Sequence, residues 1–140
     1  MPYTTRIEGN AFLRCSNLTN INCPNLEIIG DYAFQGSGVS WTRFPFKIIT
    51  IGGSAFRQCS QLVNVVMPSG LQSIGELAFY QCTALQTFDL SECLQIPTLG
   101  ANAFAYTTCT FLFRDQTQLD AYASATNWST YADRFQIKGA

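Results

Sequence analysis

The sequence predicts an α/β solenoid: a right-handed superhelix of about five short coils with a short parallel sheet and a helical cap at the carboxy end. Three observations support this prediction. An aliphatic residue recurs at steps of 22, 22, 23 and 25 residues, an Ala-Phe pair follows each of these residues at a constant offset, and an alternating apolar segment comes after it. One such unit cannot bury its own apolar side, whereas stacked units can.

The five repeats share their anchor and their aromatic position. The anchors are Ile7, Ile29, Ile51, Ile74 and Leu99. The pairs that follow four residues later are Ala11-Phe12, Ala33-Phe34, Ala55-Phe56, Ala78-Phe79 and Ala103-Phe104. Gly follows the anchor in four of the five repeats, where it permits a tight bend. We expect each Ala-Phe segment to form one short helical or 3₁₀ turn, with the five Phe rings in a single buried file.

The segment after each turn follows the pattern L-x-x-V-x-M-P, which is clearest in LVNVVMP. Apolar residues at the fourth and sixth places alternate as in a strand. Pro24, Pro45 and Pro68 end these strands by removing a hydrogen-bond donor. The strands should pair in parallel from coil to coil at about 4.8 Å per step. The second repeat lacks one residue before Val39, and the fourth has an extra SECLQI stretch before Pro97.

Residues 115–140 are predicted to form a helical cap on a solenoid that comprises residues 1–114. The apolar residues that would cover the last coil are Leu119, Tyr122 and Ala123 on one helical face, Tyr131 and Phe135 in a second short helix, and Trp128 between them. A solenoid end needs such a cover because its last coil has no further neighbour.

The amino end differs, because only six residues precede the first anchor and they are too few for a cap. We therefore expect the first coil to expose Phe12, Leu18, Ile21 and Leu26 along an unprotected parallel edge. Two interpretations follow. The chain is the last part of a longer repeat array, or a second copy covers the edge by self-association.

The six cysteines show no C-x-x-C spacing, which argues against a zinc site. Cys15, Cys59 and Cys82 share one repeat position and should stack inside the solenoid as small apolar groups. Side chains stacked in this way point in the same direction, which suits a disulfide poorly. Cys93 and Cys109 have no place in the pattern. We predict that the thiols are structural and reduced.

Charge and hydropathy exclude several classes of partner. The net charge is −1, and the eight Lys and Arg residues are scattered singly, so no basic patch is available for nucleic acid. No apolar run is long enough to insert into a membrane. The opening MPYTTRIEGN lacks the apolar core of a secretory signal. We expect either a protein made without a signal or an excised piece of a longer secreted chain.

The sequence also argues against an enzyme. It contains no histidine, the usual general base near neutral pH and a common metal ligand. Glu8, Asp31 and Glu76 recur at the starts of the turns, where acidic residues favour the helix amino end. Asp89 has no second carboxylate to work with, as a hydrolase would require. We therefore predict no catalytic residue, no cofactor and no metal site.

The strand face is the remaining candidate for a site. Residues at the third and fifth places of the pattern should point outward and form two columns on the concave side, the usual binding platform of a solenoid. These candidate ligand-binding residues are Asn20, Asn22, Trp41, Arg43, Asn64, Val66, Thr87 and Asp89. Trp41 and Arg43 are of the residue types that dominate binding hot spots. The alternative is that Trp41 packs against the shortened second coil.

The repeat I-G-x-x-A-F-x-x-C-x-x-L-x-x-V-x-x-P closely resembles the BspA-like, or Treponema pallidum-type, leucine-rich repeat family. The resemblance covers about residues 7–114, and the tail LDAYASATNWSTYADRFQIKG is similar to the carboxy-terminal end of many such bacterial proteins. The fifth repeat departs from the pattern, with Arg114 in place of the strand-ending Pro. The resemblance implies a leucine-rich repeat superhelix.

The same resemblance implies a non-enzymatic protein-binding module of the bacterial or microbial-eukaryote cell surface, or a secreted one. Repeats of this family are associated with adhesion to host proteins and to other cells, so the expected partner is a host or other cell-surface protein. One alternative is a structural carboxy-terminal segment that caps or presents the upstream repeats of a longer array. Another is a cytoplasmic scaffold, which six unbridged thiols would permit.

Overall fold

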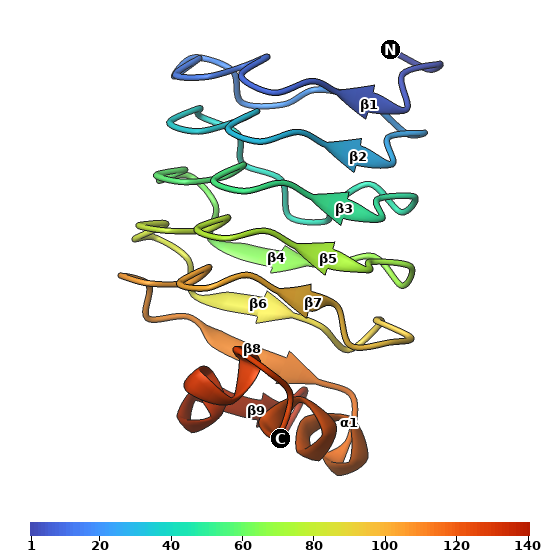
Figure 1. The fold of residues 1–140 in the computed structure, drawn as a ribbon, viewed down its shortest axis with the longest axis vertical. Coiled ribbons are helices and arrows are strands. Elements are labelled where there is room, and N and C mark those ends of the chain that lie inside the picture. The colour runs from blue at the N-terminus through green and yellow to red at the C-terminus, as the bar shows by residue number, and fades with distance from the viewer.

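The computed structural model describes residues 1–140. The coils lie one above the next along a single axis, with the amino end at one end of the stack and the helices at the other (Figure 1). Two parallel sheets run along this stack, one on each side of the interior. The predicted repeat solenoid is confirmed, but the single predicted sheet is replaced by two.

The first sheet, sheet A, consists of the anchors. Its five strands contain two residues each and pair in parallel in the order β1 (Arg6–Ile7), β2 (Ile28–Ile29), β3 (Thr50–Ile51), β5 (Ser73–Ile74) and β7 (Thr98–Leu99). In every strand the second residue is the anchor, and it is buried. The sequence pattern suggested only a bend here, because a two-residue strand is too short to show alternation.

The second sheet, sheet B, contains the L-x-x-V-x-M segments. Its strands pair in parallel in the order β4 (Asn64–Val66), β6 (Thr87–Asp89), β8 (Thr110–Phe113) and β9 (Phe135–Ile137). The first two coils contribute no strand, and a single bridge between Arg43 and Val66 joins the second coil to β4. The predicted columns are therefore regular strands only from the third coil onward.

The Ala-Phe segments are not the helical turns that we expected. Each contains residues with positive φ, such as Tyr32 at 61° and Ser54 at 55°. This left-handed backbone turns alternate N–H groups toward the next coil, so that the Phe34 N–H donates to the Ala55 carbonyl at 2.8 Å. The segment therefore forms a third ladder of hydrogen bonds between coils. The repeat requires positive φ at these positions, even where the residue is a bulky one such as Tyr32, which rarely adopts it.

The aromatic file is confirmed. Consecutive Phe rings of the five repeats lie nearly parallel, with centroids 5.4, 5.2, 5.4 and 5.3 Å apart and interplanar angles from 14° down to 3°. Four of the rings are fully buried, and Phe12 at the open end is partly exposed. Burying a side chain of this size contributes about 2–3 kcal/mol. The file is therefore a principal source of stability along the stack.

The shared cysteine position has a specific role inside the stack. The thiols of Cys59 and Cys82 donate to the carbonyls of Phe34 and Phe56 in the preceding coil, each at 3.0 Å. Burial raises the pKa of Cys59 to about 11, so this group stays a neutral donor at physiological pH. All six thiols are free. Cys15 was expected inside but is exposed, because it belongs to the uncovered first coil.

Cys93 and Cys109, which the pattern could not place, are also interior residues. Both side chains are buried. The Cys93 thiol contacts the Pro68 carbonyl at 3.6 Å, and Cys109 lies 3.8 Å from the Thr107 hydroxyl. Burial raises the pKa of Cys93 to about 12 and that of Cys109 to about 11. Both thiols are therefore protonated core groups at physiological pH.

The carboxy-terminal cap comprises helix α1 (Gln116–Ala123), the 3₁₀ helix η1 (Trp128–Arg134) and strand β9. Asp115 caps α1 by accepting from the Gln118 N–H at 2.9 Å. Tyr122 and Trp128 are fully buried against the last coil. Phe135 was expected in a helix but begins β9 instead, because this segment pairs with β8. The cap therefore prolongs sheet B as well as covering it.

The opposite end of the stack is uncapped. Phe12, Leu18 and Ile21 are partly exposed there, as expected, although each packs against the core. Leu26 was also expected at the exposed edge but is fully buried. It lies just before β2, where the chain passes from the first coil to the second. The exposed apolar edge is therefore narrower than the sequence suggested. Neither helix in the structure has the length and apolar character needed to cross a membrane.

Candidate functional site

All eight predicted site residues lie on sheet B or on its continuation into the first two coils. The structure divides them into two groups. Asn20, Asn22, Trp41 and Arg43 line one cavity of about 230 Å³, together with Ile21, Cys23, Pro24 and Pro45. Asn64, Val66, Thr87 and Asp89 lie further along the stack, on β4 and β6. We call the first group the upper site and the second group the lower face.

Trp41 forms the floor of the upper site and does not project outward as expected. Its side chain is only 8% exposed, and its ring lies against those of Phe34 and Phe44, with centroids 5.4 and 5.3 Å away. The indole N–H donates to the Asn20 Oδ1 at 3.0 Å. Packing within the second coil is therefore the correct alternative for most of this side chain.

The short second coil explains this inversion. One residue is missing before Val39, yet Arg43 still pairs with Val66 of the next coil. Nine positions separate Phe34 from Arg43, whereas ten separate the equivalent Phe56 from Val66. Trp41 therefore takes the inward position that the fourth place of the pattern occupies elsewhere, and Thr42 is exposed instead.

The rim of the upper site is polar and accessible. Asn20, Asn22 and Arg43 are all exposed. Arg43 lies 2.6 Å from the Glu92 carboxylate in an ion pair whose side chains are 59% and 43% exposed. Such an exposed pair contributes little to stability because water and salt screen it, so a ligand can compete for the guanidinium. Amide groups that both donate and accept hydrogen bonds flank it.

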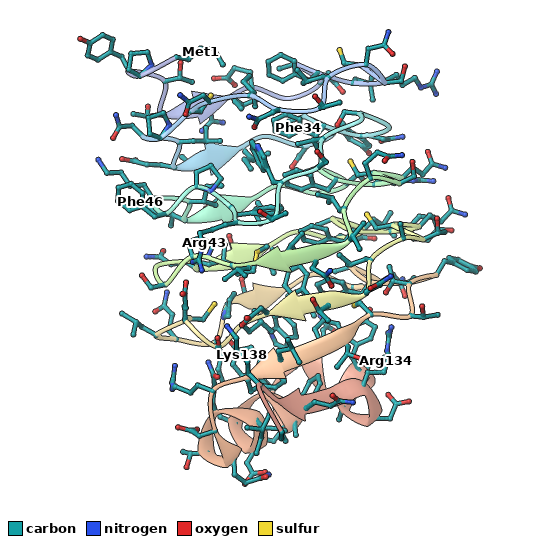
Figure 2. The ribbon with its side chains drawn as sticks, turned by 180° about the vertical axis from the view of Figure 1, so that it is seen from behind. Met1, Phe34, Arg43, Phe46, Arg134 and Lys138 are labelled. Atoms are coloured by element: carbon teal, nitrogen blue, oxygen red, sulfur yellow. The ribbon has the colours of Figure 1, made fainter.

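The lower face is closed by its own contacts. The Thr87 hydroxyl donates to the Asn64 Oδ1 at 2.8 Å. Asp89 is only 3% exposed, which contradicts its predicted place on the open surface. Lys138, which follows β9, covers it with an ion pair of 2.8 Å between Nζ and Oδ2. In Figure 2, Arg43 lies near the middle of the stack and Lys138 lies closer to the carboxy-terminal helices.

The ionisation of Asp89 reflects this enclosure. Burial alone would raise its pKa, but the bond from Lys138 and those from Ser91 outweigh burial and lower the pKa below its usual value. One of the Ser91 contacts is a backbone N–H that donates to the Asp89 Oδ1 at 2.8 Å. Asp89 is therefore a charged structural tie between sheet B and the carboxy-terminal segment.

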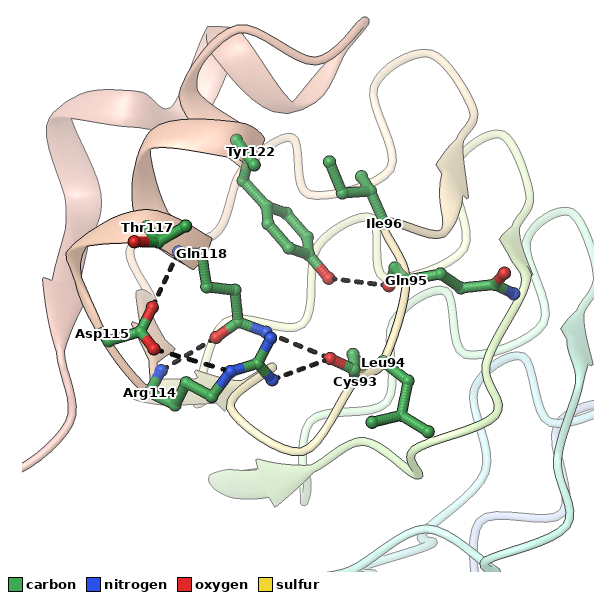
Figure 3. Close-up of a pocket in the computed structure, with 10 residues that line it drawn as sticks. Cys93, Leu94, Gln95, Ile96, Arg114, Asp115, Thr117, Gln118 and Tyr122 are labelled. Carbon is green, nitrogen blue, oxygen red and sulfur yellow. Dashed lines mark hydrogen bonds and ion pairs between the residues drawn. The ribbon is translucent and has the colours of Figure 1, made fainter.

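A second cavity, of about 220 Å³, lies between the fourth-repeat insertion and helix α1 (Figure 3). The Gln118 amide donates to the carbonyls of Leu90 and Cys93 at 2.9 and 3.3 Å, and the Arg114 guanidinium donates to Cys93 at 3.1 Å. The Tyr122 hydroxyl donates to the Gln95 carbonyl at 3.3 Å. These polar groups are occupied in holding the insertion against the cap, so the cavity has a structural explanation.

Sequence reasoning missed Phe46, which is 68% exposed and labelled in Figure 2. It follows Pro45 of the upper site directly, and Lys47 approaches its ring at 5.7 Å. The signal was present in the sequence as FPFK, an aromatic residue immediately after the Pro that ends the segment. Phe46 adds apolar area beside the upper site.

The geometry described so far defines a repeat solenoid with a capped carboxy end. A model of the BspA type leucine-rich repeat region matches residues 2–122 in six copies. The chain belongs to this family. The anchors predict five repeats, and sheet A contains five strands, so the family match counts one copy more than the anchor spacing does.

Comparison with solved structures agrees on the fold. A leucine-rich repeat protein from Bacteroides ovatus ATCC 8483 superposes with a TM-score of 0.62 at 22% sequence identity. The match covers 79% of this chain and 35% of that one, so the chain spans about a third of the length of that protein. A search of curated proteins finds no match.

Proposed function

We infer that this chain is a non-enzymatic protein-binding module that engages its partner at the upper site. The observation that carries the inference is the convergence of Asn20, Asn22 and Arg43 around a cavity of about 230 Å³ with Trp41 as its floor. The lower face is occupied by its own hydrogen bonds and by Lys138. The upper site therefore offers the most accessible polar groups among the predicted residues.

The chemistry of the upper site suits a protein segment. A Trp edge and the exposed Phe46 provide apolar area, and Arg and amide groups provide directional hydrogen bonds. Arg43 can bind a carboxylate through two N–H groups once Glu92 is displaced. We expect a peptide segment that contains an acidic residue beside an apolar one. The upper site would contact side-chain and backbone groups of this segment directly, and the proposal invokes no metal or cofactor.

Family membership supports the wider setting of this proposal. Leucine-rich repeats suggest protein interaction in general, and BspA-type proteins are often found at the cell surface or secreted. We therefore propose that the partner is a host protein or another cell-surface protein. In this proposal the chain is part of a bacterial adhesion protein that is extracellular or lies at the cell surface.

The test is binding to a panel of purified extracellular-matrix proteins immobilised for surface plasmon resonance. The double variant Asn22→Ala/Arg43→Ala should weaken binding at least tenfold, which corresponds to about 1.4 kcal/mol. The matched control is Asn17→Ala/Arg14→Ala, which removes the same chemical groups from exposed positions outside the cavity. If both variants lose the same affinity, or if neither loses any, the upper site is not where the partner binds.

The structural alternative has its own support. Strand β9 and the helices cover one end of the stack while the other end is open. A chain whose role is to close a repeat array and present what lies upstream would need this cap and no partner at the upper site. Deletion of residues 115–140, combined with the binding panel, separates the two functions.

A further inference from the structure

The turn side of the stack is hollowed at the third coil. At the second and third positions after its anchor this coil has Gly53-Ser54, where the second coil has Asp31-Tyr32 and the fourth coil has Glu76-Leu77. The smaller pair leaves a cavity of about 360 Å³ that is lined by these six residues. We call this cavity the notch. Its floor is the third coil, and its two walls are the second and fourth coils.

The floor of the notch contains a hydroxyl without a partner. Ser54 is only 3% exposed and lines the notch, yet its hydroxyl forms no hydrogen bond within the chain. Buried polar side chains normally have a partner, and a group that enters the notch would supply the missing bond. Gly53 keeps the space above the floor open, because a Cβ on Gly53 would lie 3.7 Å from the Asp31 Oδ1 and 3.4 Å from the Glu76 carbonyl oxygen.

Each wall carries a carboxylate that no cation of the chain neutralises. Neither Asp31 nor Glu76 belongs to any of the four ion pairs, and no Lys or Arg lines the notch. The Gly53 N–H donates to the Asp31 Oδ1 at 2.8 Å, which holds that carboxylate beside the floor and leaves its second oxygen free. The turns are not helices, so these acidic residues have no helix amino end to stabilise, contrary to the interpretation from the sequence. The notch is therefore a negatively charged hollow.

The walls also provide apolar surface beside the charge. Tyr32 is 45% exposed, and Leu77 is partly exposed on the facing wall. On both walls the apolar residue directly follows the acidic one, so the two kinds of surface lie next to each other in the notch. The walls are two coil steps of about 4.8 Å apart, which leaves the width of one coil for a ligand. A slender ligand with an apolar stem and a cationic end matches this arrangement.

We propose that the notch binds a lysine side chain of a partner protein. The hydrocarbon stem of this lysine lies between Tyr32 and Leu77, and its ammonium group lies between the carboxylates of Asp31 and Glu76. An ammonium group has three N–H donors, and the two carboxylates and the Ser54 hydroxyl provide three acceptors. Lysine side chains bury their stems on apolar surface in this way while the charge stays among polar groups. The notch shares no residue with the upper site, and the proposal does not depend on that site.

Other cations match the notch less well. An arginine guanidinium presents its donors in a rigid planar fork that suits one carboxylate at a time, whereas here the two carboxylates stand on opposite walls. A calcium ion takes about six to eight oxygen ligands, more than two carboxylates and one hydroxyl supply. The compact ammonium charge of lysine needs neither a planar partner nor a complete oxygen shell.

The test is a titration of the isotope-labelled chain with Nα-acetyl-lysine amide, followed by the NMR shifts of the backbone amides. The shifts of Gly53, Ser54 and Leu77 should saturate with a Kd of about 1–10 mM, as expected for a single side chain. Nα-acetyl-norleucine amide has the same stem without the charge and should bind at least about tenfold more weakly. Added salt should weaken binding of the lysine probe, because it screens the accessible carboxylates.

The double variant Asp31→Asn/Glu76→Gln should raise the Kd of the lysine probe at least about tenfold. It removes both charges but keeps the shape of the walls, and the new amide oxygen at position 31 can still accept from the Gly53 N–H. The matched control is Asp120→Asn/Asp133→Asn, which removes the same charge from exposed positions outside the notch and should bind as the native chain does.

The variant Ser54→Leu tests the cavity itself and leaves the charges in place. Leu77 occupies the equivalent position of the fourth coil with φ of 59°, close to the 55° of Ser54, so the backbone accepts leucine there. This variant should give the NMR spectrum of a folded chain and no shifts with the lysine probe. The proposal is overturned by equal affinity for the two probes, by equal loss in the two double variants, or by unchanged binding in Ser54→Leu. Absence of saturable shifts, or displacement of the lysine probe by an equal concentration of calcium, would also overturn it.

Discussion

Trp41 is the residue at which packing and recognition compete, because its ring belongs to the core while its edge reaches the cavity. Replacing it with Ala should remove contacts with Phe34, Phe44 and Phe56 and lower the free energy of unfolding by about 3–5 kcal/mol. Thermal unfolding should show a drop of several degrees in Tm.

The matched control for this variant is Tyr3→Ala. Tyr3 is 93% exposed, so its removal should change the free energy of unfolding by no more than about 0.5 kcal/mol. An unchanged Tm for Trp41→Ala would mean that the indole contributes to binding alone, contrary to its burial.

Asp89 predicts a specific dependence of stability on pH. Its folded-state pKa is lowered, so its contribution is present above the unfolded value of about 3.9 and is lost as the pH falls through the folded pKa. Urea unfolding should therefore show a lower midpoint for Asp89→Asn than for the native chain at pH 7, and the difference should shrink below about pH 4.

The exposed Asp133→Asn serves as the control, since it forms no ion pair. Its urea midpoint should follow that of the native chain at every pH. A constant difference between Asp89→Asn and the native chain from pH 7 to pH 3 would show that the pKa of Asp89 is the same in the folded and unfolded states, contrary to the contacts with Lys138 and Ser91.

At the scale of elements, the distance between coils depends on the glycine after each anchor. The coils approach so closely that a Cβ on Gly75 would lie 2.5 Å from the Gly53 backbone nitrogen. A backbone atom held between two coils cannot move aside, so Gly75→Ala should destabilise the chain by about 1–3 kcal/mol. Differential scanning calorimetry measures this change.

Gly70 provides the comparison within the same chain. A Cβ there would meet nothing within 4 Å. Gly70→Ala should be neutral or stabilise the chain by up to about 1 kcal/mol, because it restricts the unfolded state. Equal effects at both positions would show that contact between coils is not the reason for glycine after the anchor.

For the whole molecule, the cap decides whether the stack is stable at its carboxy end. Removal of residues 115–140 would expose the last coil, including Phe104 and Phe111, whose rings pack against Trp128 and Tyr131 of the cap. We expect the shortened chain to aggregate or to lose cooperative unfolding, as repeat proteins without a terminal cap do. Circular dichroism and light scattering report both outcomes.

Removing only Gly139 and Ala140, which are exposed, should leave the unfolding transition unchanged. Full stability of the chain 1–114 would mean that the cap is dispensable, and it would weaken the structural alternative. A soluble but binding-deficient chain 1–114 would instead link the cap to recognition.

Local sequence carried enough information for the repeat, the Phe file and most of the predicted surface residues. A fixed offset from each anchor repeats five times, and identical positions in stacked coils must fall in line. The same logic failed where one coil differs in length. The missing residue before Val39 changed which side chain enters the core, and periodicity alone does not show how the backbone absorbs a deletion.

By itself, the sequence determined that the chain stacks short coils around a buried file of aromatic rings, because this depends only on a period and on apolar positions within it. Only the tertiary structure decided that the anchors form a sheet of their own, that Lys138 closes over Asp89, and that Trp41 turns inward. Each of these outcomes depends on which backbone lies beside which, and pairings between residues 20 to 50 positions apart are set by the whole stack and not by any one repeat.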